Sequence, residues 1–209
     1  MTHSNGDIYE GMWLKDKANG YGIFIDVNSE AKYEGYWMDD LQHGDGIETW
    51  GRPGKPSASF VGKFYKGKKQ GRGCFKWEDG SFYEGDFYDG QFSGFGKYYF
   101  ADLNKYYEGE FRFGKMEGRG VETWADGRRY EGDFKSGKKD GEGTFYWQSG
   151  QTYIGSWRSG KQHGLGIIVD PQTSEKRHGE WCHGKRKRWI DPLEVINQSH
   201  HPSPAKPHK

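Results

Sequence analysis

The first pattern that suggests chemistry is a glycine-lysine motif, Gly-x4-Gly-Lys, whose five copies start at Gly62, Gly109, Gly132, Gly155 and Gly179. A phosphate-binding loop has this spacing, but there a Ser or Thr follows the lysine to bind Mg²⁺ and a helix begins at the loop. In this chain the residues after the five lysines are Lys69, Met116, Lys139, Gln162 and Arg186. The motif therefore does not predict nucleotide binding.

Paired acids are the next candidates, because two carboxyl groups in an apolar pocket can perform acid-base catalysis. The recurring pairs are Glu84 with Asp86, Glu108 with Glu110, and Glu131 with Asp133. Each pair is separated by one residue in an alternating pattern, which predicts a solvated acidic face of a sheet. Neither cysteine carries a catalytic motif around it, so we predict no catalytic residue and no enzyme activity.

Three possible metal ligands, His178, Cys182 and His183, cluster near the end of the chain. Their spacing matches no known zinc-finger pattern, and on one strand and its turn they would point to different sides. His43 and His163 occupy one equivalent position in different parts of the sequence, where we expect a turn. We therefore expect no metal and no cofactor.

The composition excludes several classes of protein. The 209 residues carry a formal net charge of +1, which gives no attraction to nucleic acid. No segment approaches 18 consecutive apolar residues, and the start of the chain lacks the pattern of a signal peptide. The two cysteines, Cys74 and Cys182, suit a reducing compartment. We expect a soluble, cytoplasmic protein.

A repeat of 23 to 27 residues runs through the sequence, with starts at Tyr9, Tyr33, Phe60, Tyr83, Tyr107, Tyr130, Tyr153 and Arg177. Each start is followed by Gly two positions later and by an aromatic residue two positions after that. These aromatic residues are Trp13, Trp37, Phe64, Phe87, Phe111, Phe134, Trp157 and Trp181. Seven units then carry a Gly-x-Gly pair, which the eighth unit lacks.

Each unit is predicted to form a two-stranded hairpin. Alternation puts the rings of Tyr130 and Phe134 on one face of the first strand. A polar turn is expected over 135–140, followed by a return strand, 141–147, whose Gly141, Gly143, Phe145 and Trp147 share one face. Glycine leaves a flat floor on which a ring of the neighbouring strand can lie.

One hairpin cannot bury its rings alone, so the hairpins must stack. The sequence predicts an all-β fold, an elongated single-layer twisted antiparallel sheet of stacked β-hairpin repeats. We expect residues 1–8 to be the end of an incomplete leading repeat and residues 9–185 to form seven full units and one half unit. Residues 186–209 should hold a basic run, a short capping helix starting at Asp191, and a tail rich in Pro and His.

The repeated pattern Tyr-Glu-Gly-x-Trp/Phe-x-x-Gly-Lys-x-x-Gly-x-Gly resembles the MORN (membrane occupation and recognition nexus) repeat, a solenoid of hairpins. The segments 107–124 and 130–147 match it almost throughout. The resemblance implies roles as diverse as axonemal components, membrane tethers, cytoskeletal scaffolds and repeats attached to enzyme domains.

Our main hypothesis is a non-enzymatic scaffold that binds partner proteins of a larger cytoskeletal or axonemal complex along its array. The resemblance implies a cytoskeletal location, in the cilium or flagellum, at the basal body, or at the cell cortex. The partner-binding residues would be the eight aromatic residues that follow the repeat glycines, since buried rings anchor partner peptides in grooves. Homodimerisation is left open.

A first alternative is a peripheral membrane tether that recognises anionic phosphoinositide lipids through basic residues. These are the recurring Lys68, Lys115, Lys138, Lys161 and Lys185 with the adjacent Arg186, Lys187 and Arg188. A second alternative is a regulatory repeat region of a larger enzyme.

Overall fold

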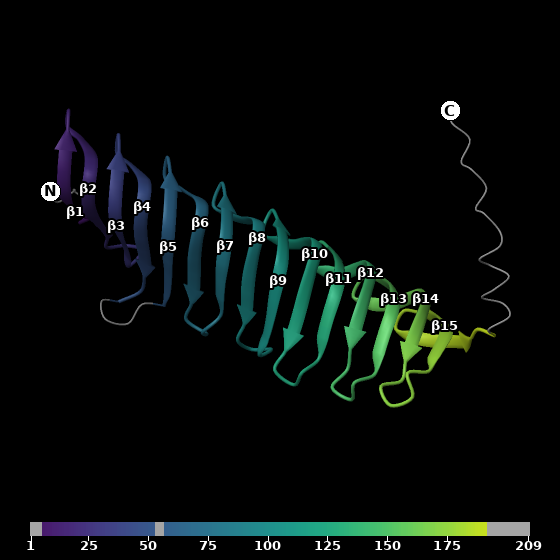
Figure 1. Ribbon diagram of the computed structural model, residues 1–209. Helices are drawn as coiled ribbons and strands as arrows, with labels where there is room; N and C mark the ends of the chain where they lie inside the picture. Colours follow the sequence, from purple (N-terminus) through teal and green to yellow (C-terminus); the bar gives the residue numbers. More distant parts are fainter. Residues whose placement is uncertain (1–5, 53–56, 192–209) are drawn as a thin grey trace, which may run out of the picture. The chain divides into compact units, whose positions relative to one another are not determined.

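Each repeat of the sequence folds as one β-hairpin (Figure 1). The computed structural model describes residues 6–52 and 57–191, which form sixteen strands and no helix. The strands are β1 Ile8–Leu14, β2 Lys17–Asp26, β3 Ala31–Met38, β4 Leu41–Trp50, β5 Ala58–Tyr65, β6 Lys68–Trp77, β7 Phe82–Tyr88, β8 Gln91–Phe100, β9 Lys105–Arg112, β10 Lys115–Trp124, β11 Arg129–Lys135, β12 Lys138–Tyr146, β13 Thr152–Arg158, β14 Lys161–Val169, β15 Lys176–Cys182 and β16 Lys185–Trp189.

The chain divides into two units, Met1–Ala125 with β1 to β10 and Asp126–Lys209 with β11 to β16. Within each unit, every strand pairs antiparallel with the strands before and after it in the sequence. The predicted all-β architecture of successive antiparallel hairpins is confirmed. No helix in the described residues is long and apolar enough to cross a membrane.

The hairpins close through turns of two residues, as at Ser136 and Gly137, whose φ angles are +49° and +80°. Positive φ at both positions is the geometry of a type I′ turn, which matches the right-handed twist of paired strands. The predicted six-residue turn over 135–140 is therefore wrong, because β12 already begins at Lys138. Likewise, His43 lies in β4 and His163 in β14, not in turns.

Within each unit, glycines pair with glycines across the middle of the strands from β1 to β15. In the first unit this ladder is Gly11, Gly22, Gly35, Gly46, Gly62, Gly73, Gly85, Gly96, Gly109 and Gly120. In the second unit it is Gly132, Gly143, Gly155, Gly166 and Gly179. A Cβ at Gly143 would lie 2.3 Å from the hydroxyl oxygen of Tyr130. The prediction that the rings lie directly against glycine residues of the neighbouring strand is confirmed.

The core consists of the buried aromatic side chains that pack on this glycine ladder, which we call the ring chain. The Tyr83 ring is fully buried and its hydroxyl donates a hydrogen bond of 2.8 Å to the backbone carbonyl of Asp86. The centre of this ring lies 5.2 Å from the ring centre of Phe87 in its own repeat and 5.0 Å from that of Phe111 in the next repeat, and both contacts are edge to face. Edge-to-face contacts add to area burial because the positive ring edge meets the negative ring face. The repeats are therefore joined by alternating aromatic contacts within each unit.

The strict alternation predicted for the return strand fails at the first glycine of each Gly-x-Gly pair. Gly132 faces Gly143 and Phe134 faces Lys139, so three residues of β12 lie opposite one residue of β11. This bulge places Gly141 at a φ of +116°, which glycine adopts without steric cost. Gly141 and Gly143 therefore do not continue one simple alternating face.

The bulge explains the recurring acids. The carboxylate of Asp133 accepts a hydrogen bond of 2.9 Å from the backbone N–H of Glu142 in the bulge. Equivalent bonds run from Phe95 N–H to Asp86 and from Arg119 N–H to Glu110. The second acid of each pair is thus a structural acceptor, which corrects the prediction that both acids of a pair are merely solvated.

The last repeat is more complete than predicted. The basic residues Lys185–Arg188, of which those from Arg186 on were predicted to follow the array, form most of β16, and this strand pairs with β15. Trp189 stands opposite Gly179, where the other hairpins have a second glycine. The array therefore ends in a short eighth hairpin instead of half a unit. The predicted helix after Asp191 lies outside the described residues.

The buried tyrosines predict a loss of stability at alkaline pH. Burial, with a smaller contribution from Glu142, raises the pKa of Tyr153 from 10.0 to about 12. Burial also raises the pKa values of Tyr33, Tyr83 and Tyr107. Above pH 10 the unfolded chain loses protons that the folded chain retains, so stability should fall as pH rises from about 10 to about 12. Urea unfolding across this range measures the effect, and constant stability would contradict it.

Candidate functional site

Six of the eight aromatic residues predicted to bind partners are buried in the ring chain: Phe64, Phe87, Phe111, Phe134, Trp157 and Trp181. Their burial agrees with the expectation that they are buried rings, and each is covered by tyrosines or phenylalanines of its own or a neighbouring repeat. Their role in partner binding stays a prediction. Trp13 is 44% exposed and Trp37 is half-buried. Together with Phe24 and Leu41 they line a hollow of about 590 Å³.

A different set of rings is accessible. We call Trp50, Phe75, Trp77, Tyr98 and Phe100 the aromatic surface; all are half-buried and come from the second strands β4, β6 and β8. Their ring centres follow one another at 5.4, 4.6, 5.3 and 4.2 Å. Five adjoining rings therefore present a continuous, partly exposed surface beside the buried ring chain.

Two lysines flank the aromatic surface. The ammonium of Lys69 lies 5.0 Å from the ring centre of Trp50 and 2.7 Å from the carboxylate of Glu48. The ammonium of Lys105 lies 4.6 Å from the ring centre of Phe100 and 2.6 Å from the carboxylate of the buried Glu122. Each lysine is held by a ring and a carboxylate together. These contacts fix the edges of the surface without giving it a net charge.

Sequence reasoning missed the aromatic surface although its signal was present. The prediction placed Phe145 and Trp147 on one face of the return strand with Gly141 and Gly143, and Phe75 and Trp77 are their equivalents. The rings of the first strands recur in every repeat and so give the stronger sequence signal. Regular recurrence, however, marks the positions that every repeat needs for its core.

The basic residues of the lipid hypothesis lie in two settings. Lys68 pairs with Asp89 and Arg188 lies 3.2 Å from Glu180. In the described structure, no ion pair involves the exposed lysines at the starts of β10, β12, β14 and β16, which are Lys115, Lys138, Lys161 and Lys185. Lys187 is exposed in β16.

Arg186 has a different neighbour, because its guanidinium stacks 4.2 Å from the ring centre of Trp189. Arg177 approaches the same ring at 4.1 Å. Part of the basic run therefore serves the packing of the last hairpin.

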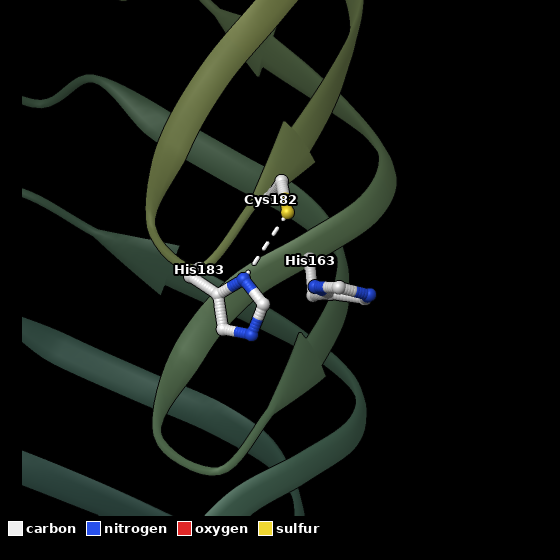
Figure 2. A group of neighbouring side chains, drawn as sticks. All are labelled: His163, Cys182 and His183. Atoms are coloured by element: carbon white, nitrogen blue, oxygen red, sulfur yellow. Dashed lines mark hydrogen bonds between the residues drawn. The ribbon is translucent and has the colours of Figure 1, made fainter.

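A group of possible metal ligands comes from β14 and the last hairpin. Figure 2 shows His163 beside Cys182 and His183, and their ligand atoms all lie within 4.8 Å of one another. The sequence drew attention to His178 instead, which faces Ile167 in the register of β15 with β14. Four positions along β15, about 13 Å, separate His178 from Cys182, whereas the pairing of β14 with β15 brings His163 beside Cys182.

The Gly-x4-Gly-Lys motifs have no phosphate-binding geometry. In the second unit, the motif from Gly132 spans the end of β11, the turn at Ser136–Gly137 and the first residue of β12. Strands flank it on both sides, so no helix N-terminus faces the loop.

The hairpins, the glycine ladder and the ring chain define a repeat protein whose units bury their side chains against their neighbours. A comparison with known protein families matches the MORN repeat at residues 9–30, 33–52, 60–82, 83–105, 107–128, 130–152 and 153–172. The chain belongs to the MORN repeat family, and these repeats imply a role in protein or lipid interaction. A comparison with curated proteins found no match.

Proposed function

We propose that this protein is a non-enzymatic scaffold that binds a partner protein through the aromatic surface on β4, β6 and β8. The observation that carries the proposal is the run of five adjoining, half-buried rings from Trp50 to Phe100. Trp and Tyr are enriched among the side chains that contribute most binding energy at protein interfaces, and Phe is also enriched at interfaces.

The surface suits a partner because it is ordered before binding. Trp50 and Phe100 are held at their edges by Lys69 and Lys105, whose charges are balanced by Glu48 and Glu122. A partner that covers rings already held in place loses little side-chain entropy. The balanced charges favour an apolar segment, such as one face of a helix, over a strongly charged ligand.

We place the partner in a cytoskeletal assembly, such as a ciliary axoneme, a basal body or the cell cortex. The support is the resemblance of the repeats to those of scaffolds in such structures. A series of similar hairpins, each able to expose rings on its second strand, suits a protein that spans several neighbours in a polymer.

Lipid binding is the second candidate. The observation that favours it is the row of exposed lysines Lys138, Lys161 and Lys185, which start successive second strands of the unit Asp126–Lys209. Each lysine near an anionic membrane contributes about 1 kcal/mol. A regulatory role within a larger enzyme is the third candidate.

Detergent and salt extraction of the source cells separates these functions. We expect the wild-type chain to stay in the cytoskeletal pellet after non-ionic detergent, because detergent dissolves lipid but not protein lattices. The double variant Trp77→Gln with Tyr98→Gln should reduce the retained fraction by about tenfold, as expected for the loss of interface anchors.

Two matched variants make this result specific. The first is Val61→Gln with Phe95→Gln. Both side chains are 51% exposed and lie on the opposite face of the sheet, because each is adjacent in sequence to a residue of the core face, Phe60 or Gly96. This variant should leave the retained fraction unchanged. Lys138→Glu with Lys161→Glu and Lys185→Glu should also leave it unchanged. Release of the wild-type chain by detergent alone, with liposome binding lost in the lysine variant, would refute the scaffold and support the membrane tether.

A further inference from the structure

Three side chains with metal-binding chemistry meet at the last hairpin (Figure 2). His163 belongs to β14, Cys182 is the last residue of β15, and His183 is the first residue of the turn into β16. Cys182 Sγ and His183 Nδ1 are 3.1 Å apart, and the rings of His163 and His183 have centres 5.3 Å apart. The imidazole of His163 therefore meets the thiol of Cys182 and the imidazole of His183, two adjacent residues that lie 19 and 20 positions further along the chain.

The donor set fits a zinc ion. Imidazole nitrogen and thiolate sulfur are the ligands of most protein zinc sites, with Zn–N near 2.0 Å and Zn–S near 2.3 Å. Tetrahedral geometry then places ligand atoms about 3.3 to 3.6 Å apart. The observed separations, from 3.1 Å to at most 4.8 Å, lie within about 1.5 Å of these values.

The second observation concerns His163 itself. Its Nδ1 atom is buried and has no hydrogen-bond partner among the described residues. A buried polar atom without a partner is costly, and a metal ion or ordered water would remove this cost. His43 occupies the equivalent position of another repeat and has the same buried Nδ1.

His43 differs from His163 in its neighbours. Beside His43, Tyr65 and Lys66 stand where Cys182 and His183 stand in the last hairpin, and the ring of Tyr65 lies 5.3 Å from that of His43. A tyrosine and a lysine do not form a soft-metal site at neutral pH. The chain thus contains a nearly identical position without the ligand set, which serves as an internal control.

We propose that His163, Cys182 and His183 bind one Zn²⁺ ion, with the fourth position taken by water. Binding converts the Cys182 thiol to a thiolate and releases its proton to solvent, so affinity should fall as the pH is lowered. The ion joins β14 to the turn between β15 and β16. A hydrogen bond of 2.8 Å from the N–H of Gly184 to the carbonyl of Gln162 already connects the same two segments.

The bound ion would stabilise the last hairpin by linking it to β14. Strand β16 has only five residues and pairs through four registered positions with β15. Zinc would protect the backbone amides of β16 from hydrogen exchange, because opening the hairpin would require dissociation of the ion. The remaining repeats would be unaffected.

The direct test titrates the full-length, metal-free protein with Zn²⁺ by calorimetry and with Co²⁺ by absorption spectroscopy. We expect one ion per chain and a thiolate-to-cobalt charge-transfer band. His163→Gln, Cys182→Ser and His183→Ser should each weaken Zn²⁺ binding by more than about 100-fold, since even outer-shell changes cost 10–100-fold. His163→Gln and His183→Ser copy residues that other repeats carry at the same positions, namely Gln70 and Ser136 or Ser159. Cys182→Ser replaces the thiol by a hydroxyl of similar size.

The controls are His43→Gln and Cys74→Ser, which should leave affinity and the cobalt band unchanged. Thermal melting in the presence of a chelator shows whether a ligand variant still folds. The proposal is overturned if Zn²⁺ does not bind at micromolar concentration. It is also overturned if the band survives Cys182→Ser or if one ion binds per two chains.

Discussion

Replacing Tyr83 with alanine is expected to lower the free energy of unfolding of the unit Met1–Ala125 by about 3–5 kcal/mol, the range for removing a buried ring. The side chain is fully buried, and its ring contacts Phe87, Phe92 and Phe111. Loss of the ring would leave a cavity and separate two repeats. Urea unfolding followed by circular dichroism measures the change.

Two variants distinguish the loss of the ring from the loss of the hydroxyl. Tyr83→Phe removes only the hydroxyl, which donates to the carbonyl of Asp86 at 2.8 Å and lies 3.5 Å from that of Ser93, and should cost about 1 kcal/mol. Phenylalanine is already accepted at the equivalent Phe60, which is also fully buried. Trp13→Ala should cost less than Tyr83→Ala because Trp13 is 44% exposed. A cost below about 1 kcal/mol for Tyr83→Ala would show that the ring chain is not the core.

Adding a single methyl group at Gly96 is expected to destabilise the same unit by about 3 kcal/mol, the upper part of the usual range for overpacking. A Cβ at Gly96 would lie 2.5 Å from both Cε2 and the hydroxyl oxygen of Tyr83. The ring cannot withdraw, because Phe87 and Phe111 hold its edges. Gly96→Ala therefore tests the glycine ladder by equilibrium unfolding.

The matched control is Gly114→Asn in a turn of the same unit. Gly114 has a φ of +74° and no atom within 4 Å of an added Cβ, and asparagine tolerates this backbone conformation. Its expected cost is below about 1 kcal/mol. If the two variants lowered the free energy of unfolding equally, the glycines would be required for their backbone conformation and not for the space that the Tyr83 ring occupies.

The sequence predicted the hairpin architecture because glycine and aromatic residues recur in fixed register. Gly132 and Gly143 had to face a ring, and the structure places Tyr130 there. The bulge at Gly141 could not be predicted from alternation, since it arises where β11 pairs with β12 and is accompanied by the hydrogen bond of Asp133 with a backbone N–H on that partner strand. Such a bond joins residues nine positions apart, which a period of two does not reveal.

The candidate sites were harder to predict for the same reason. Recurrence singled out Phe111 and Phe134, which are buried because every repeat needs them. The accessible rings, such as Trp77 and Tyr98, vary between repeats, and only the pairing of strands shows that they adjoin. His163 likewise joins Cys182 across a strand pair.

The architecture separates stability from recognition within one face of the sheet. The glycine ladder crosses the middle of the strands with the buried rings packed on it, and the aromatic surface occupies the later part of the second strands. Substitutions on the surface can therefore change a partner without removing the core. The Trp77 and Tyr98 variants should accordingly keep most of the wild-type stability.

The measurement that tests the central claim most directly is photo-crosslinking in the source cells. A benzophenone amino acid at position 98 lies on the aromatic surface, and one at position 95 lies on the opposite face, where Phe95 is 51% exposed. We predict a discrete protein adduct from position 98 that is absent from position 95 and is lost with Trp77→Gln. An adduct from position 95 alone, or none from position 98 in a chain retained in the cytoskeletal pellet, would contradict the proposed binding surface.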